Sequence, residues 1–278
     1  MTATHHESGR PIQVVLFGSG PKLNPDVKEF LCRLEDHPDI TLAGAYFQAK
    51  SSTWGAAAED LWRRRRLLAP PLLCLELLNA TTRAVFHRRA EMRVRAKLAR
   101  LVDRMHFVPD VHAPAVLDEI GLLKPDLGLV YGSPILKPVL FEKPRLGTLG
   151  IHHGKVPEYR GNKTTFWAMY NGEPFAGVTI QQLNAGLDTG SIVKEGQVPI
   201  GRRSQRTVRR ELEALGLDLY LQAIVDVKDG RATYRPQTGR KGKLYRNPRF
   251  LDLVTFWRRR AKRHLSWRDA NTMSRPAS

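Results

Sequence analysis

Two histidines and one aspartate stand where chemistry is usual in a domain of alternating strands and helices. His152 and His153 follow an apolar run at 146–151 that is typical of a strand, and Asp188 lies in a Gly-Leu-Asp-Thr-Gly turn between two further predicted strands. Ligands bind outside the carboxyl ends of strands in open α/β sheets, so we expect these side chains to meet. A carboxylate beside an imidazole fixes its tautomer and stabilises the imidazolium, which favours acid-base catalysis near neutral pH.

Spacing alone leaves a plainer alternative open. The chain has nine histidines, so a surface histidine and a turn-forming aspartate could share this pattern by accident. Three further motifs accompany the two residues in a fixed order along the chain. A Pro-Glu-Tyr-Arg-Gly turn stands at 157–161, Gly-Val-Thr at 177–179 and Leu-Asp-Thr-Gly at 187–190.

This series of motifs closely resembles the N-terminal catalytic domain of the 10-formyltetrahydrofolate-dependent formyltransferases. That family includes methionyl-tRNA formyltransferase, glycinamide ribonucleotide formyltransferase and the sugar N-formyltransferases. The resemblance runs from about residue 127 to 196, and the separation of 36 residues between His152 and Asp188 agrees with the family. It implies a Rossmann-like formyltransferase fold, in which helices flank a mostly parallel central sheet.

The resemblance also implies a reaction, in which an amine attacks the formyl carbon of 10-formyltetrahydrofolate through a tetrahedral intermediate. His152 would stabilise the developing charge and assist proton transfer, and Asp188 would orient His152 and help to take the proton of the amine. The folate would lie between the loop after the fourth strand and the loop that bears the aspartate. The folate-binding residues implied here are Tyr131, Ser133, Pro134, Ile135, Leu136, Asn184 and Asp188.

Three residues of the turn after His152 are expected to bind the acceptor: Tyr159, Arg160 and Asn162. An arginine in such a turn could grip a phosphate or a carboxylate. It could equally tie the turn to the sheet, and the sequence leaves both readings of Arg160 open. No metal site is expected.

One position departs from the family. The family carries an asparagine two residues before the catalytic histidine, where this chain has Gly150. Side chains two apart on a strand point to the same face, so the missing carboxamide is the one that would donate to the formyl oxygen. Loss of one such donor costs about 3 kcal/mol. We expect another donor to take over, and the candidates are Thr148, His153, Asn162 and Lys163.

The expected function is therefore formyl transfer to a primary amine of a small acceptor. A nucleotide-linked aminosugar is the preferred acceptor, because a basic surface suits a phosphorylated substrate. Residues 228–278 are expected to be too short for the C-terminal β-barrel of the family's tRNA enzymes, which disfavours initiator tRNA. The alternatives are a catalytically impaired relative that binds RNA, DNA or an anionic membrane, and a hydrolase of the formyl-folate.

Charge and cysteine content indicate which partners and which cellular location the protein could have. The chain has 45 Lys and Arg residues against 27 Asp and Glu residues, a formal net charge of +18, which would attract nucleic acid, an anionic membrane surface or a phosphorylated substrate. A solvated basic surface without a specific partner fits equally well. Cys32 and Cys74 have no metal-ligand spacing, and neither a signal peptide nor an apolar run of membrane-spanning length is seen. We expect a cytoplasmic protein, and the oligomeric state stays open.

The expected elements alternate as an α/β domain requires. Strands are predicted at 12–17, 40–47, 127–131, 146–151, 177–183 and 192–198, and helices at 24–34, 115–122, 164–170, 207–227 and 250–264. An Arg-rich, mostly helical insertion is predicted at 53–107, with an amphipathic basic second part. The predicted organisation is a catalytic domain at 1–227 followed by a basic C-terminal extension at 228–278.

Overall fold

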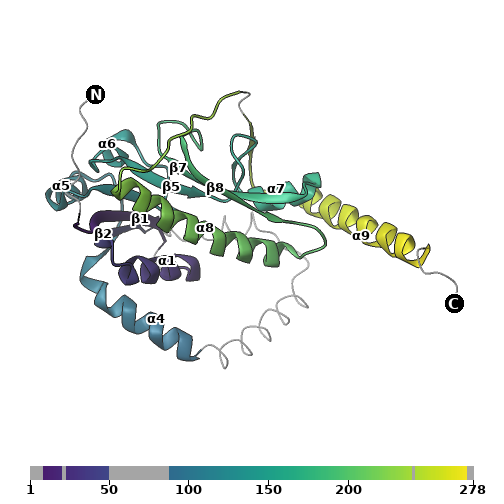
Figure 1. Ribbon diagram of the computed structural model, residues 1–278, viewed down its shortest axis with the longest axis horizontal. Coiled ribbons are helices and arrows are strands. Elements are labelled where there is room, and N and C mark those ends of the chain that lie inside the picture. The colour runs from purple at the N-terminus through teal and green to yellow at the C-terminus, as the bar shows by residue number, and fades with distance from the viewer. Residues whose placement is uncertain (1–8, 21–22, 50–87, 240–241, 274–278) are drawn as a thin grey trace. The chain divides into compact units, whose positions relative to one another are not determined.

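The structure is a computed structural model that describes residues 9–20, 23–49, 88–239 and 242–273 (Figure 1). The chain divides into two compact units, Gly9–Leu146 and Gly147–Ser278. They are called the N-terminal unit and the C-terminal unit below. Each unit contains its own set of paired strands and the helices that cover them.

The N-terminal unit is built on four parallel strands in the order β3-β2-β1-β4. Its strands are β1 (Ile12–Ser19), β2 (Ile40–Gln48), β3 (Met105–Val108) and β4 (Leu127–Val130). Its helices are α1 (Pro25–Asp36), α4 (Arg88–Arg100), the 3-10 turn η1 (Val102–Arg104), α5 (Pro114–Leu123) and α6 (Pro138–Phe141). Parallel strands need a crossover between them, and α1 supplies the one from β1 to β2.

Local sequence explains these elements. The β1 side chains from Val14 to Phe17 are fully buried, because the strand lies between two neighbours and is covered on both faces. Helix α1 begins after Asn24, whose side chain accepts a hydrogen bond from Val27 N at 2.8 Å, and Pro25 occupies the first helical position.

The C-terminal unit is built on three antiparallel strands in the order β5-β7-β8. These are β5 (Thr148–His152), β7 (Phe175–Gln182) and β8 (Ile192–Pro199). Helices α7 (Thr164–Asn171), α8 (Gln205–Lys228) and α9 (Phe250–Met273) accompany them, and β6 (Tyr159–Gly161) pairs in parallel with β9 (Lys243–Tyr245). Helix α8 packs against this sheet, where the Tyr220 hydroxyl donates to the Leu149 carbonyl oxygen at 2.7 Å.

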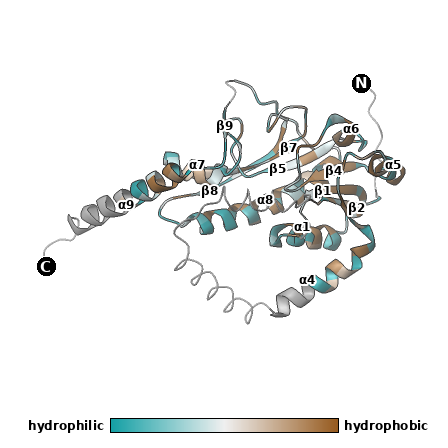
Figure 2. Cartoon of the chain, turned by 180° about the vertical axis from the view of Figure 1, so that it is seen from behind, coloured by the Kyte–Doolittle hydropathy of each residue, from teal (hydrophilic) through white to brown (hydrophobic). Residues whose placement is uncertain are grey.

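An aromatic cluster joins the last elements of the chain to α7. Phe256 of α9 is buried, and its ring centroid lies 5.0 Å from that of Phe166. The ring centroids of Trp167 and Tyr245 are 5.3 Å apart. Figure 2 shows hydrophobic and hydrophilic residues side by side at the start of α9 and along α8, as expected for helices with one packed face. Tyr245 and Phe256 are thus part of this unit's core.

The predicted α/β class with a mostly parallel sheet flanked by helices is confirmed. The prediction for 53–107 was wrong at its end, because Met105–Val108 forms a strand that pairs with β2. Within that stretch α4 is helical, and residues 50–87 lie outside the described part of the chain. The short β6, β9 and α6 were not predicted. The boundary at residue 227 stays a prediction, as do the roles of the insertion and the extension.

Among the described residues, no helix is both long enough and apolar enough to span a membrane.

The buried carboxylate of Asp126 gives the first testable prediction. It accepts from Arg145 Nη2 at 2.7 Å and from Gln13 N at 3.0 Å. Burial alone would raise the pKa of Asp126, but these hydrogen bonds outweigh burial and lower the pKa. The ionised carboxylate therefore contributes stability above its unfolded pKa of about 3.9, and this stability is lost as pH falls through the lower folded pKa. Asp126→Asn should lower the free energy of unfolding by about 2 kcal/mol at pH 7.

Urea denaturation of wild type and Asp126→Asn between pH 7 and pH 3 measures this effect. The difference between the two proteins should shrink toward the acid end, because the Asp126 carboxyl group of the unfolded wild type takes up a proton below about pH 3.9 while that of the folded wild type stays ionised, which favours unfolding. A difference that stays constant over this range would contradict the assignment. Asp118→Asn, on an exposed position of α5, is the control and should change stability little.

Candidate active site

His152 ends β5 and is buried, with 8% of its surface exposed. Its Nε2 lies 2.7 Å from the Tyr159 carbonyl oxygen, and its Nδ1 lies 3.4 Å from Asp188 Oδ1. Because a carbonyl oxygen can only accept, Nε2 carries the proton of the neutral ring. Nδ1 is then the nitrogen that can take a proton, and it faces the carboxylate that stabilises the resulting imidazolium.

Asp188 is held from two sides. Its Oδ2 accepts from Gly161 N at 2.7 Å, and its Oδ1 accepts from Gln181 Nε2 at 3.4 Å. Its own backbone is left-handed, with φ of 51°, a conformation that aspartate tolerates better than most residues. The carboxylate is thereby aimed at His152, as the sequence predicted.

The turn after β5 can donate to Asp188 because of Gly161. This residue has φ of +87°, and a Cβ atom there would collide with the Tyr245 carbonyl oxygen. Gly161 N points to Asp188, while the other side of the turn pairs with β9. A side chain at this position would push the turn away from the strand that supports it.

Arg160 and Tyr159 contact the protein itself. The Arg160 guanidinium donates to the Leu187 carbonyl oxygen through Nη2 at 2.6 Å and Nε at 3.0 Å, so it ties the turn to the loop that bears Asp188. The Tyr159 hydroxyl donates to Glu173 Oε1 at 2.7 Å, and burial with this carboxylate raises the pKa of Tyr159. Both residues position the site, and their contact with an acceptor stays a prediction.

Asn184 and Asn162 lie in exposed loops. The Asn184 side chain shapes the aspartate loop: its Oδ1 accepts from Gly186 N at 3.0 Å and from Thr189 Oγ1 at 2.8 Å. Asn162 donates its backbone N–H to the Tyr245 carbonyl oxygen at 2.8 Å. Folate binding by Asn184 and acceptor binding by Asn162 stay predictions.

The other predicted folate residues belong to the N-terminal unit, in the segment after β4. Tyr131 and Leu136 are buried there, Ile135 is 79% exposed, and Ser133 donates to the Pro134 carbonyl oxygen at 2.7 Å. The buried Tyr131 hydroxyl has no hydrogen-bond partner among the described residues. Such an atom suits a segment that receives a polar ligand, since buried polar groups are normally paired.

Four residues were predicted to replace the missing asparagine as a donor: Thr148, His153, Asn162 and Lys163. His153 points to α8, where its Nε2 lies 3.0 Å from Glu213 Oε2, and burial lowers the pKa of His153 to about 4. It therefore lies on the opposite face of β5 from His152. Asn162 and Lys163 are exposed, and Thr148 is buried at the start of the strand.

Two glutamines at the site were not predicted. Gln181 contacts Asp188 directly. Gln237 Nε2 lies within hydrogen-bonding distance of three acceptors, which are Gln181 Oε1, the Asp188 carbonyl oxygen and the Gly190 carbonyl oxygen, at 3.2, 3.1 and 2.8 Å. Alternation along the predicted strand at 177–183 could have placed Gln181 on one face with Thr179. No sequence signal marks Gln237, because it reaches the site only through the folding of the C-terminal residues.

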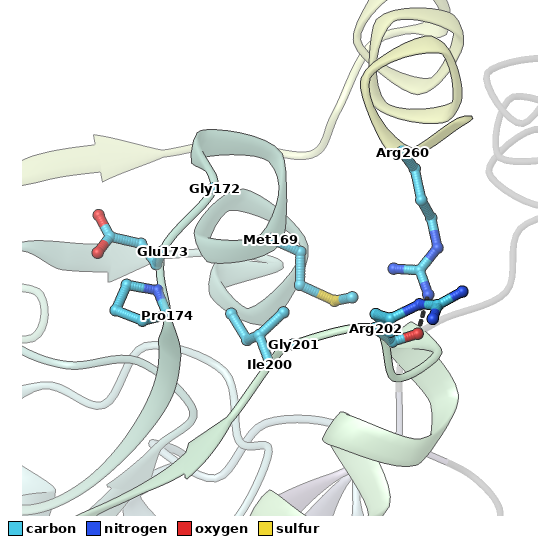
Figure 3. A pocket seen from close by; sticks show the side chains of 8 residues that line it. All are labelled: Met169, Gly172, Glu173, Pro174, Ile200, Gly201, Arg202 and Arg260. Carbon is cyan, nitrogen blue, oxygen red and sulfur yellow. Dashed lines mark hydrogen bonds between the residues drawn. The ribbon is translucent and has the colours of Figure 1, made fainter. Parts of the chain in front are cut away.

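A separate hollow of about 220 Å³ lies elsewhere in the C-terminal unit (Figure 3). Arg260 of α9 borders it and donates to the Arg202 carbonyl oxygen at 2.9 Å. None of the predicted site residues lines it, and its walls hold no acid-base pair like that of His152 and Asp188. This hollow is therefore separate from the site around His152. Among the described residues, no group of three or more potential ligands is placed to hold a metal ion.

Comparison with known proteins identifies the family. The family pattern described as Formyl transferase matches residues 80–224, more than half of the chain. The chain belongs to the formyl transferase family. The methionyl-tRNA formyltransferase of Parabacteroides distasonis is 35% identical over 124 residues, which are 44% of this chain and 38% of that relative. The chain thus matches less than half the length of this curated relative.

Solved structures share the fold of this chain. A sugar N-formyltransferase from Shewanella sp. superposes with a TM-score of 0.55 at 14% identity, covering 88% of this chain and 86% of that one. HypX from Aquifex aeolicus in complex with tetrahydrofolic acid gives a TM-score of 0.53 at 14% identity, covering 89% of this chain and 34% of that one. At these identities the likeness concerns the fold.

Gly154→Ala tests the hydrogen bond that holds His152. An added Cβ would collide with the Tyr159 carbonyl oxygen and with His152 Nε2, the two partners of that bond. The variant should lose about 1 to 3 kcal/mol of unfolding free energy, measured by urea denaturation. Gly121→Ala, inside α5 with only the flexible Lys143 Nζ nearby, should be neutral or stabilising. Equal effects of the two changes would contradict the packing described for Gly154.

Proposed function

We propose that the protein transfers a formyl group from 10-formyltetrahydrofolate to the primary amine of a small acceptor. The observation that carries this proposal is the buried His152–Asp188 pair, with Nδ1 and Oδ1 3.4 Å apart and the carboxylate fixed by Gly161 N. Membership of the formyl transferase family supports the reaction type. The neighbouring structure with bound tetrahydrofolic acid supports the donor.

The proposed reaction needs one proton to move. A carbon–nitrogen bond forms between the amine and the formyl carbon, and the bond from that carbon to N10 of the folate breaks. The proton that leaves the amine is taken by His152 Nδ1, and the Asp188 carboxylate stabilises the charged ring. The same proton is then returned to N10, so the products are the formamide and tetrahydrofolate. The Tyr159 carbonyl keeps the ring oriented throughout.

The folate supplies the formyl group and is a substrate of this reaction. Residues of two segments would hold it: Tyr131, Ser133, Pro134, Ile135 and Leu136 after β4, and Asn184 with Asp188 in the loop between β7 and β8. The unpartnered Tyr131 hydroxyl and the exposed amides of the aspartate loop suit a polar heterocycle.

A nucleotide-linked aminosugar is the proposed acceptor. The sugar N-formyltransferase from Shewanella sp. is matched over most of both chains, which supports an acceptor of this size. The formal charge of +18 suits the phosphates of such a molecule. The relative from Parabacteroides distasonis is named for methionyl-tRNA, which makes tRNA the acceptor to compare.

His152→Ala tests the reaction. Purified protein is mixed with 10-formyltetrahydrofolate and an amine, and tetrahydrofolate release is followed by absorbance. Without the proton acceptor the amine attacks slowly, so we expect kcat to fall by about 10² to 10⁴. His153→Ala is the matched control, because its ring faces α8 and not Asp188, and it should keep most of the activity of the folded protein.

Asp188→Asn should also lower kcat, because its amide cannot stabilise the imidazolium. Release of tetrahydrofolate that does not need an amine would show a hydrolase instead. Release that persists in His152→Ala would contradict the assigned role of the pair.

The acceptor is identified by a panel at fixed folate concentration. We expect nucleotide-linked aminosugars to raise the release of tetrahydrofolate at least tenfold over the rate with water alone, and methionyl-tRNA to do so less. The corresponding free aminosugars, which lack the phosphates, separate charge recognition from amine recognition. A panel in which methionyl-tRNA is the best acceptor would overturn the aminosugar assignment and leave formyl transfer in place.

A further inference from the structure

A carboxamide stands directly across from the glycine that replaces the family's asparagine. In the antiparallel pair of β5 and β7, Gly150 is opposite Gln181 and His152 is opposite Thr179. Opposite residues in such a pair point to the same face, with Cβ positions about 5 Å apart. Gln181 therefore shares a face with His152 and lies beside the place that an asparagine at position 150 would occupy.

The orientation of this carboxamide follows from its neighbours. Gln237 presents one atom to the Asp188 and Gly190 carbonyl oxygens at 3.1 and 2.8 Å, so that atom is the nitrogen. The same nitrogen lies 3.2 Å from Gln181, so the Gln181 atom that faces it is the oxygen. The Gln181 nitrogen is thereby turned toward the catalytic pair.

This nitrogen lies 3.4 Å from Asp188 Oδ1, the oxygen that also faces His152 Nδ1 at 3.4 Å. A carboxamide nitrogen carries two protons, and this long contact engages one of them. Within the described part of the chain, the Gln181 nitrogen donates no second hydrogen bond. Gln181 is only 6% exposed, so the donor is held in a site from which most water is excluded.

Strand β7 is irregular at Gln181. The pairing of β7 with β8 shifts its register between Ile180 and Gln181. Such irregularities re-aim a side chain and are frequent beside active sites. On the other side of β7 the register with β5 stays regular, so Gln181 keeps its place opposite Gly150.

We propose that Gln181 is a catalytic residue that donates Nε2–H to the formyl oxygen as negative charge develops there. This role rests on the proposed formyl transfer. In the tetrahedral intermediate the carbonyl electron pair moves to that oxygen, and it returns when the bond to N10 breaks. A preorganised donor stabilises the charge in between. Gln237 is a positioning residue, since it acts only by holding Gln181 Oε1.

Gln181→Met tests the proposal, since it keeps the length of the side chain and removes the donor. Tetrahydrofolate release from 10-formyltetrahydrofolate is measured with hydroxylamine as a small amine. We expect kcat to fall by about 10² to 10³ with little change in KM for the folate, because the interaction is made in the transition state. Gln182→Met is the matched control, one residue along and on the opposite face of β7, and it should keep kcat within about threefold of wild type.

Gly150→Asn in the Gln181→Met background restores the family's carboxamide and should recover at least tenfold in kcat. A structural role for Gln181 would not predict this recovery, so its absence in a folded double variant overturns the proposal. If thermal unfolding shows that the double variant does not fold, Gln181→Glu decides, because it keeps an oxygen toward Gln237 and removes the donor. Wild-type kcat in Gln181→Glu overturns the proposal, and a loss like that of Gln181→Met supports it.

A second readout does not depend on turnover. The ¹⁵N side-chain amide signal of Gln181, assigned by its disappearance in Gln181→Met, should shift when 10-formyltetrahydrofolate is added in the His152→Ala background. It should shift much less with tetrahydrofolate, which lacks the formyl oxygen. Equal shifts with both folates would overturn the donor role.

The proposed function and the proposed role of Gln181 can be contradicted separately. The proposed function and this role are both contradicted if the wild type releases no tetrahydrofolate with any acceptor and the amide signal of Gln181 shifts with neither folate. An active wild type with an equally active Gln181→Met contradicts only the role of Gln181.

Discussion

The hydrogen bond from Gly161 N to Asp188 Oδ2 is the contact on which the rest of the site depends. It joins the turn after β5 to the loop between β7 and β8 and aims the other carboxylate oxygen at His152. Two further contacts repeat the connection: Arg160 binds the Leu187 carbonyl oxygen, and the Tyr159 carbonyl oxygen binds His152. The residues of one motif therefore hold the residues of the other, which explains why both occur together in one chain.

The support behind this contact comes from the C-terminal residues. Strand β9 pairs with the turn, the Tyr245 ring stacks on Tyr159 with centroids 5.1 Å apart, and Gln237 holds the loop of Asp188. Phe256 then fastens α9 to α7. The segment that the sequence shows as a basic extension therefore supports the site through β9, Tyr245 and Gln237. Two aromatic residues of this segment, Tyr245 and Phe256, are buried and pack against the rest of the unit.

Much of this could be predicted from the sequence, and the exceptions have physical causes. Mostly apolar runs such as residues 12–17 predict buried strands, and the motifs around His152 and Asp188 predict that these two side chains meet. Strands of three or four residues, such as β6 and β9, have too few side chains to show a period and form only because they pair with each other. The contacts of Gln181 and Gln237 depend on register and on distant folding, and neither is written in local composition.

Strand register also determines which residue stands next to Gly150. Glycine in place of the family's asparagine leaves β5 without a side chain at this position, and Gln181 of β7 stands directly opposite it. In an antiparallel pair each such space has two neighbours, one on each strand, so a polar group can pass from one strand to the other without moving in space. The distances from Gln181 and His152 to one oxygen of Asp188 are equal, at 3.4 Å. The surroundings of that oxygen, more than the motif at position 150, decide whether this centre can stabilise charge.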